Sequence, residues 1–357
     1  MVGGGRKGDT LMASRWLVFS TGPARAPRSG VPVLDQSDCV PSKPPTGYLS
    51  PEYADSLREF GQPHPLLLSG GWVLTRPIPG SPFTDAMGCY PLFACTDWSG
   101  LRADLDLLSA DLVSLSLVAD PFGDYNLEQL QSCFDFVLSF KRHFVTNLRE
   151  PLSSFVSKNH QRHVRKALQK VHVQRCEPAI AFLDEWTAFY AHLQARHSFG
   201  GIQAFSRAAF AKQLTVPGLV VFRAAARDRA VGIHLWYVHG SVAYYHLGAT
   251  SAEGYRLSAS YALFWHALNS FRSEVPWLDL GGVPGLDENA SSGLRQFKAG
   301  WATGTRPAFF CGKVLQPASY NRLVQDLHPG ATRYFPAYRA GEHRAGAAAS
   351  SGGTERP

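Results

Sequence analysis

The order of predicted elements between residues 158 and 282 constrains the fold more than any other feature of the chain. Apolar residues at helical spacing alternate with short runs of β-branched and aromatic residues. A sheet with helices packed on its faces follows from this order. The expected elements are helices over 158–171, 180–193 and 258–271, and strands over 219–223, 231–238, 242–247 and 277–281.

The chain before residue 150 also predicts a mixed α/β unit. Ser50 precedes a proline and is suited to cap a helix, and Asn126 and Gln129 have the spacing of a capping box. The other expected elements are two strands joined by a turn at Gly70 and Gly71, a strand over 112–118 and a strand over 136–144.

Length and composition indicate more than one domain. A single hydrophobic core rarely organises 357 residues, and 45% hydrophobic content excludes a chain disordered throughout. We expect a mobile tail over 1–30, an N-terminal unit over 31–150, a second unit over 151–315, a C-terminal return segment over 316–340 and a mobile tail over 341–357.

Hydropathy and charge bear on location and partners. No run reaches the ~18 apolar residues that a membrane span needs, and the apolar run at residues 16–19 is too short for a signal peptide. We therefore expect a cytoplasmic protein. The net charge of +7 suggests an anionic partner.

Metal and nucleotide-phosphate motifs are missing from the sequence. The six cysteines form no C-x-x-C pair, and the chain has no H-E-x-x-H and no phosphate loop of the Walker type. His160 and His163 stand three apart, but the cationic residues around them would repel a metal ion, so no metal is expected. Asp104 and Asp106 are expected on a solvated helix face.

A basic segment over residues 141–175 holds nine lysines and arginines against one acid. Such a cluster can bind the phosphates of RNA or of a nucleotide-linked substrate. The alternative is a solvated helix face, which charge runs commonly are. Both interpretations stay open for Arg162, Arg165 and Lys166.

The most distinctive local pattern is a strand that ends at Asp279 and runs into a glycine-rich loop. Gly281 and Gly282 allow the backbone to approach a ligand closely. Phe297 and Lys298 follow in what the sequence predicts to be a glycine-flanked turn. A lysine there can stabilise a developing oxyanion, or it can be an ordinary surface lysine.

This pattern, with residues 293–301 and the preceding 244–250 segment, resembles the FemAB-type aminoacyltransferases and their relatives with a BioF2-like acetyltransferase domain of the GNAT type. The resemblance covers roughly residues 110–315. It implies an α/β fold of two GNAT-like subdomains, the acyl-CoA N-acyltransferase fold, with a cleft between them.

The resemblance also implies roles for individual residues. Lys298 and Phe297 correspond to the pair at the reacting carbonyl, and the arginines of the 160–170 helix fall near those that hold a nucleotide-sugar diphosphate. Asp279, His246 and Tyr245 could supply a proton route, although His246 fits a core histidine equally well. The expected catalytic residues are Lys298, Phe297, Asp279 and His246, and the expected substrate-binding residues are Arg162, Arg165, Lys166, Tyr245, Arg256, Gly281 and Gly282.

The donor stays open. A GNAT enzyme holds the coenzyme A pyrophosphate on a glycine-rich helix start, where this chain has Arg256, Ala259 and Tyr261, and Tyr261 would crowd the diphosphate. Enzymes that use transfer RNA often carry a helical arm, and no heptad run is present. We expect an acyltransferase that acts on an amine of a cell-envelope or exopolysaccharide precursor with acyl-CoA (acetyl-CoA) as donor. The alternatives are aminoacyl-tRNA-dependent transfer onto a peptidoglycan precursor and a non-catalytic module that binds a nucleotide-sugar or RNA.

Overall fold

The structure is a computed structural model that describes residues 44–197, 201–283, 293–327, 332 and 334–340. The described residues belong to one compact unit that begins at Pro44. The tails expected over 1–30 and 341–357 lie outside the described residues.

The first half of the described chain is a mixture of short helices and strands. It consists of η1 (Gly47–Leu49), α1 (Pro51–Ser56), β1 (Gln62–Leu66), β2 (Gly71–Pro77), β3 (Thr84–Gly88), α2 (Leu101–Leu108), β4 (Ser114–Val118), α3 (Leu127–Cys133), β5 (Phe136–Asn147) and α4 (Leu152–Phe155).

The second half has longer helices and a long antiparallel run of strands. It consists of α5 (Lys158–Leu168), β6 (His172–Cys176), η2 (Ala179–Phe182), α6 (Leu183–His197), η3 (Gly201–Gln203), α7 (Arg207–Gln213), β7 (Leu219–Ala226), β8 (Arg229–His239), β9 (Val242–Thr250), α8 (Ala252–Arg256), α9 (Ala259–Phe271), β10 (Trp277–Asp279), α10 (Gly293–Ala299), β11 (Gly304–Val314), α11 (Pro317–Leu327) and η4 (Ala337–Arg339).

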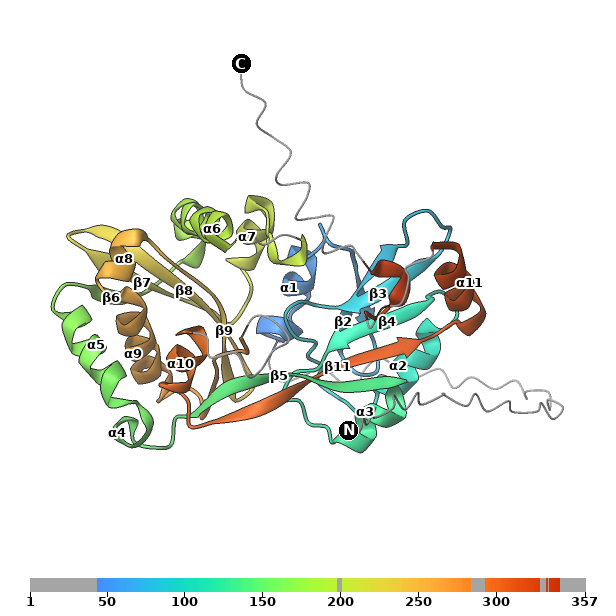
Figure 1. Cartoon of the computed structure of the whole chain (residues 1–357), viewed down its shortest axis with the longest axis horizontal. Coiled ribbons are helices and arrows are strands. Elements are labelled where there is room, and N and C mark those ends of the chain that lie inside the picture. Colours follow the sequence, from blue (N-terminus) through green and yellow to red (C-terminus); the bar gives the residue numbers. More distant parts are fainter. Residues whose placement is uncertain (1–43, 198–200, 284–292, 328–331, 333, 341–357) are drawn as a thin grey trace, which may run out of the picture. The chain divides into compact units, whose positions relative to one another are not determined.

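All of these strands belong to one mixed sheet, in the order β1-β2-β3-β4-β11-β5-β10-β9-β8-β7-β6. β11 comes from near the end of the described chain, yet it lies between β4 and β5 and pairs with both (Figure 1). The pairing of β5 with β11 slips by one residue, so that Phe140 has no opposite residue on β11. Such a bulge bends a strand and re-aims its side chains.

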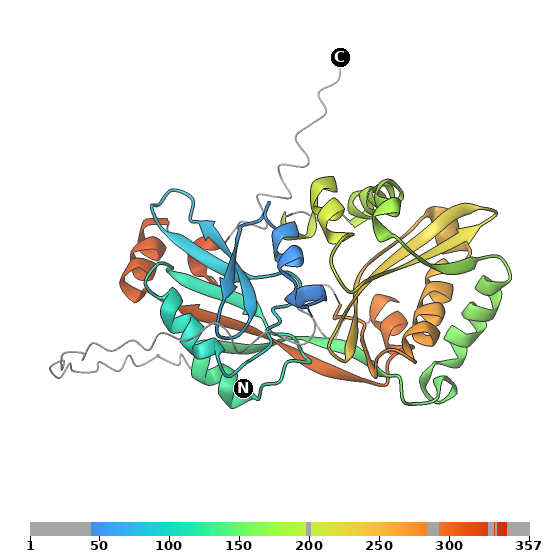
Figure 2. The ribbon, with the colours of Figure 1, turned by 180° about the vertical axis from the view of Figure 1, so that it is seen from behind.

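Two hydrophobic cores cover the two faces of strands β6–β9. On one face, α5 and α9 contribute Val164 and Phe264, which pack with Trp236 of β8. On the other face, α6 and α7 contribute Trp186 and Phe210. Figures 1 and 2 show these helix pairs on opposite sides of the strands. A third core lies in the first half, between the sheet and helices α2 and α3.

The local signals for helix starts are confirmed. Ser50 accepts a hydrogen bond from the amide of Glu52 (3.1 Å) and caps α1. Asn126 and Gln129 form the predicted capping box of α3, with two reciprocal bonds of 2.8 Å. These caps use only neighbours in the sequence, so a short pattern is enough to find them.

The expectation for Asp104 is wrong. Its side chain lies on α2 but is buried, and its carboxylate accepts the amides of Leu68 (3.0 Å) and Ser69 (2.7 Å). These amides belong to the turn between β1 and β2, more than 30 residues earlier, so the helical pattern around Asp104 could not reveal them.

The boundary expected near residue 150 stays a prediction. β5 ends just before it and pairs on one edge with β11 and on the other with β10. The ladders of the two halves are therefore continuous through this strand.

The last described segment is tied to β3 by a buried ion pair. Asp85 is fully buried and accepts hydrogen bonds from Arg339 (2.5 and 2.9 Å) and from the hydroxyl of Tyr338 (3.0 Å). Arg76 of β2 contacts the same carboxylate at 3.3 Å.

We expect Asp85→Ala to lower the free energy of unfolding by about 3–5 kcal/mol, because it removes the carboxylate from a buried guanidinium. Urea unfolding of the purified chain measures this. Asp55→Ala is the matched control, since Asp55 makes exposed ion pairs with Arg58 and Lys212 and should cost less than about 1 kcal/mol. Equal losses in the two variants would show that the buried pair does not anchor this segment.

Candidate functional site

The site lies where strands β9 and β10 separate. They pair in parallel over only three residues, Val242–Tyr244 with Trp277–Asp279. Beyond this point β9 continues along β8 to Thr250, whereas the chain after β10 follows β5. Beyond Tyr244 this edge of β9 therefore has no strand partner among the described residues.

The two glycines after β10 bring the backbone close to charged side chains. Gly281 has φ +73°, a conformation that favours glycine, and a Cβ there would lie 3.3 Å from Nζ of Lys298. A Cβ on Gly282 would lie 3.2 Å from the side chain of Lys141 on β5. The glycines thus allow two lysines to approach one short stretch of backbone.

Lys298 is a buried amine. Only 8% of it is exposed, and Nζ donates a hydrogen bond to the carbonyl of Gly282 at 2.5 Å. Burial lowers its pKa to about 8; the charge of Asp279 acts in the opposite direction and that of Lys141 lowers it further. A cation of this kind can hydrogen-bond an oxygen on which negative charge develops.

Phe297 and Lys298 lie on helix α10, so the prediction of a turn is wrong. Gly293 begins the helix and Gly300 follows its last residue, and glycines so close together mimic the signal of a turn. The ring of Phe297 packs in the core against the rings of Tyr261 and Phe264, with centroid distances of 4.9 and 5.2 Å.

A buried histidine on α5 holds α10 in place. Nε2 of His160 contacts the carbonyl oxygen of Phe297 at 2.8 Å, and Nδ1 contacts the hydroxyl of Ser157 at 2.7 Å. The ring packs edge-on against Trp301 and lies so close to Gly300 that a Cβ there would overlap it. The glycine and the tryptophan after Lys298 therefore have a packing role in seating the lysine.

Asp279 forms a buried pair with a histidine that the sequence did not identify as a site residue. Nδ1 of His143 on β5 lies 2.8 and 3.0 Å from the two carboxylate oxygens, and Oδ1 also accepts the amide of Gly281 at 2.7 Å. Both side chains are buried. No sequence pattern links the two residues, because they are 136 positions apart and meet only through the pairing of β5 with β10.

A second carboxyl group lies near this pair. Asp120 follows β4 and accepts a hydrogen bond from the hydroxyl of Tyr244 at 2.7 Å. Burial raises its pKa to about 6, although hydrogen bonds from Phe122 and Tyr244 oppose the shift. Asp279 raises this pKa slightly and His143 lowers it, which places all three groups in one electrostatic neighbourhood.

His246 and Tyr245 point to opposite faces of β9, as neighbours on a strand do. His246 lies in the core beside α7, with its ring nitrogens at 3.1 Å from the hydroxyl of Tyr48 and 3.3 Å from the amide oxygen of Gln213. Burial lowers its pKa to about 3. Tyr245 packs against Trp236 in the core on the other face. Neither residue makes a hydrogen bond to Lys298 or Asp279.

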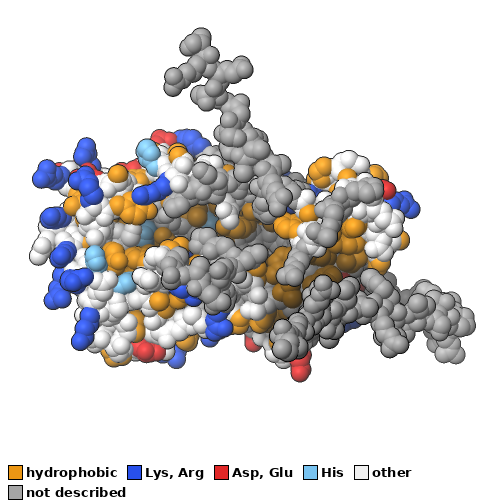
Figure 3. Space-filling model, in the orientation of Figure 1, with side chains coloured by type: hydrophobic (Ala, Val, Ile, Leu, Met, Phe, Trp, Pro, Cys, Tyr) orange, Lys and Arg blue, Asp and Glu red, His pale blue; other side chains and the backbone are white. Residues whose placement is uncertain are grey.

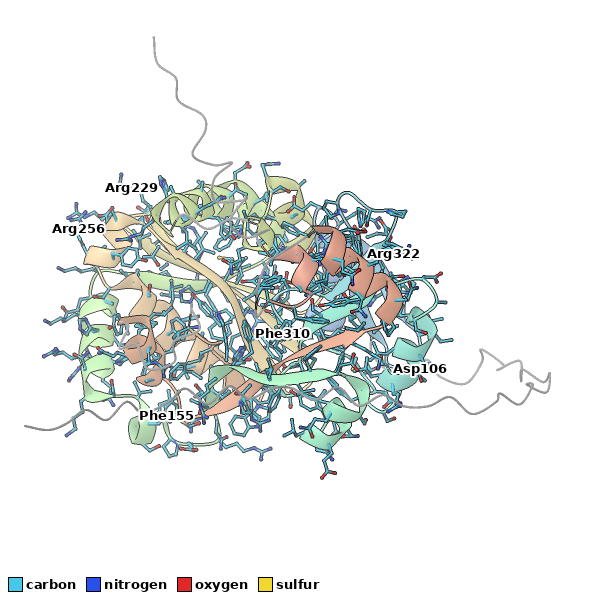
Figure 4. The ribbon with its side chains drawn as sticks, turned by 45° about the vertical axis from the view of Figure 1, so that its right-hand side comes forward. Asp106, Phe155, Arg229, Arg256, Phe310 and Arg322 are labelled. Carbon is cyan, nitrogen blue, oxygen red and sulfur yellow. The ribbon has the colours of Figure 1, made fainter. Side chains whose placement is uncertain are left out.

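The expected phosphate-binding residues are exposed on the surface, whereas Lys298 is buried. Arg162, Arg165 and Lys166 are exposed on the outer face of α5, and Figure 3 shows blue side chains along the edge where α5 lies in Figure 1. Arg256 is exposed at the end of α8 and points outward in Figure 4, as does Arg229.

The start of α9 is the place where a GNAT enzyme would hold the coenzyme A pyrophosphate and where the sequence of this chain departs from that pattern. Ser258 precedes it with φ +60° and makes no side-chain capping bond. The ring of Tyr261 stacks on His163 of α5 at 4.6 Å. In the described part of the chain, no three His, Cys, Asp or Glu side chains are grouped so that they could hold a metal ion.

We expect Gly300→Ala to lower the free energy of unfolding by about 1–3 kcal/mol, because the added methyl group overpacks the His160 ring. Gly304→Ala is the matched control, since an added Cβ there meets nothing within 4 Å. Urea unfolding of both variants makes the comparison. An unchanged stability for Gly300→Ala would mean that the contact between α5 and α10 is loose.

Comparison with known proteins agrees with this architecture. FemX has the same fold, with a TM-score of 0.57 at 15% identity, covering 79% of this chain and 95% of FemX. A C-terminal domain assigned to lysylphosphatidylglycerol synthetase of Agrobacterium fabrum gives 0.54 at 15% identity, covering 76% and 91% of the two chains. A conserved protein of unknown function from Bacteroides thetaiotaomicron gives 0.52 at 11%, covering 76% and 92%.

No curated protein matches the sequence. No helix in the described residues has the length and apolar character to cross a membrane.

The fold is α/β with two GNAT-like subdomains, as predicted. Residues 154–299 match the family model of the acetyltransferase (GNAT) domain, and this stretch contains α5, the β9–β10 separation and Lys298. The chain therefore carries an acetyltransferase domain of the GNAT type, and these findings together support an acyltransferase.

Proposed function

We propose that this chain is an N-acyltransferase that uses acyl-CoA, with acetyl-CoA as the simplest donor, to acylate an amine of a cell-envelope or exopolysaccharide precursor. The observation that carries the proposal is the buried amine of Lys298, held against the carbonyl of Gly282 at the point where β9 and β10 separate. The proposal includes the cytoplasmic location expected from the sequence.

The chemistry of acyl transfer fits this arrangement. When an amine attacks an activated carbonyl, negative charge develops on the carbonyl oxygen. Nζ of Lys298 has three donor hydrogens, and within the described part of the chain one of them is engaged, by the carbonyl of Gly282. At Gly281 the absent Cβ lets Nζ lie close to the backbone. The protein then needs to hold the amine nitrogen close to the carbonyl carbon of the donor, in the orientation for attack.

One feature supports a nucleotide-linked ligand. The exposed cations of α5, Arg162, Arg165 and Lys166, could hold the diphosphate of a nucleotide-sugar acceptor. We place Arg256, Tyr245, Gly281 and Gly282 in the same proposal as substrate-binding residues, with Phe297 as the residue that seats Lys298.

Aminoacyl-tRNA is the second candidate donor. The exposed cations along α5 would also suit the phosphates of RNA. The two donors differ in the leaving group, a thiol from acyl-CoA and a ribose hydroxyl from aminoacyl-tRNA, so that one assay separates them.

The first test measures thiol release from acetyl-CoA by the purified chain in the presence of UDP-linked amino sugars, with transfer from aminoacyl-tRNA as a parallel assay. We expect amine-dependent release of the thiol. Lys298→Met should lower kcat by about 10²–10³, the loss typical of one oxyanion donor, while Lys313→Met, a control on β11, should keep the rate.

Transfer from aminoacyl-tRNA alone would overturn the choice of acyl-CoA. Transfer from neither donor would overturn the proposed function.

The pH dependence follows from the pKa of Lys298. The ammonium form is the useful one, and with a pKa of about 8 it is lost as the pH rises through that value. We therefore expect kcat to fall above about pH 8. Lys298→Arg, whose guanidinium stays charged, should be slower near neutral pH but should lose this alkaline decline. If kcat of Lys298→Arg still falls above about pH 8, the decline is due to the titration of another group.

A further inference from the structure

We infer that His143 is the group that accepts the proton from the attacking amine, and that Asp279 is its positioning residue. The inference rests on the proposed acyl transfer and deepens it. The sequence pointed instead to Asp279, His246 and Tyr245 for a proton route, since nothing in the pattern around His143 marks it as a catalytic residue.

The geometry determines which nitrogen of His143 is engaged with Asp279. Nδ1 lies 2.8 and 3.0 Å from the two oxygens of Asp279, and a carboxylate accepts hydrogen bonds, so Nδ1 carries the proton. In the neutral ring Nε2 then holds the lone pair, which is the form that a proton acceptor needs. The amide of Gly281 donates to the same carboxylate at 2.7 Å and fixes its orientation.

The position of His143 on β5 places it at the site of Lys298. Gly281 is hydrogen-bonded through its carbonyl to the amide of Phe144, the next residue along β5. Lys141 lies two residues before His143, on the same face of the strand, and packs against Gly282, whose carbonyl receives Nζ of Lys298. His143 and Lys298 therefore flank the same two glycines.

The charged and titratable groups around this pair come from several elements. Lys298 lies on α10 and Lys141 on β5, while Asp120, next to Tyr244, approaches from the end of β4. His239 lies 4.0 Å from Asp120. His246 is a poor alternative as proton acceptor, because both of its ring nitrogens contact buried core side chains.

The proposed step balances as follows. The amine nitrogen attacks the thioester carbon, a C–N bond forms, and the carbonyl π electrons move to the oxygen beside Lys298. The N–H proton passes to Nε2 of His143. The oxygen electrons then restore the carbonyl, the C–S bond breaks, and the leaving thiolate takes the proton back from His143. The products are an amide and coenzyme A thiol, with His143 again neutral.

The experiment compares His143→Gln and His143→Ala with the wild type, using acetyl-CoA and the UDP-linked amino sugar that the wild type acetylates. We expect kcat to fall by about 10²–10⁴, the range for general base catalysis, with donor affinity by isothermal titration within about threefold. Added imidazole should restore part of the rate of His143→Ala. His192→Gln, at an exposed position on α6, is the matched control.

Asp279→Asn tests the positioning role separately. An amide can donate to Nδ1 and so favours the wrong tautomer, and we expect a loss of about 10²-fold or more together with a changed acidic limb of the pH–rate profile. A residue needed only for folding would lower the melting temperature without altering that limb.

The outcomes distinguish this inference from the proposed function. If the wild type transfers the acetyl group and His143→Gln keeps the rate within about threefold, with the same pH profile, the inference is overturned while the function stands. If a folded His143→Ala, with normal donor binding, is inactive and imidazole does not restore it, proton acceptance by His143 is overturned. If the wild type transfers nothing from either donor, both are overturned.

Discussion

The hydrogen bonding of β5 on both of its edges is the interaction on which the rest of this structure depends. One edge pairs with β11 along most of the strand, and the other pairs with β10 and the two residues that follow it. This strand joins the two GNAT-like subdomains in one sheet. It also sets the register that brings His143 to Asp279 and Lys141 to Gly282. A slip of one residue would turn both side chains to the other face.

The region around β10 concentrates ionisable groups that are expensive to bury. Lys298, His143, Asp279 and Asp120 are all less than one-tenth exposed. Each is held by a hydrogen bond. Burial lowers the pKa of Lys298 and raises that of Asp120, so that both values move toward neutral pH. Well-packed apolar residues of similar volume would stabilise the fold at least as well as such a cluster. Clusters of buried ionisable groups are common at functional sites. Two hydrophobic cores that contain many aromatic residues pack against the surrounding strands, one on each face of the sheet.

Much of the fold could be predicted, but unevenly. The strands β7, β8 and β9, the helices α5 and α9, and the caps at Ser50 and Asn126 follow from patterns within a few residues. β11 was not predicted. α10 was mistaken for a turn because Gly300, which follows it, has a packing role that only its distant partner His160 reveals. Asp104 was misplaced for the same reason, since its partners are the amides of another turn.

The sequence by itself determined the α/β class, most of the helices and strands, and the importance of the stretch from Asp279 to Lys298, because each depends on the spacing of neighbouring residues. Only the tertiary structure decided that His143 pairs with Asp279, that His160 seats α10, and that His246 lies in a core on the opposite face from Tyr245. These contacts join residues more than one hundred positions apart, or depend on which face of a strand meets which helix. Strand register determines both, and it is a property of the whole sheet rather than of any one segment.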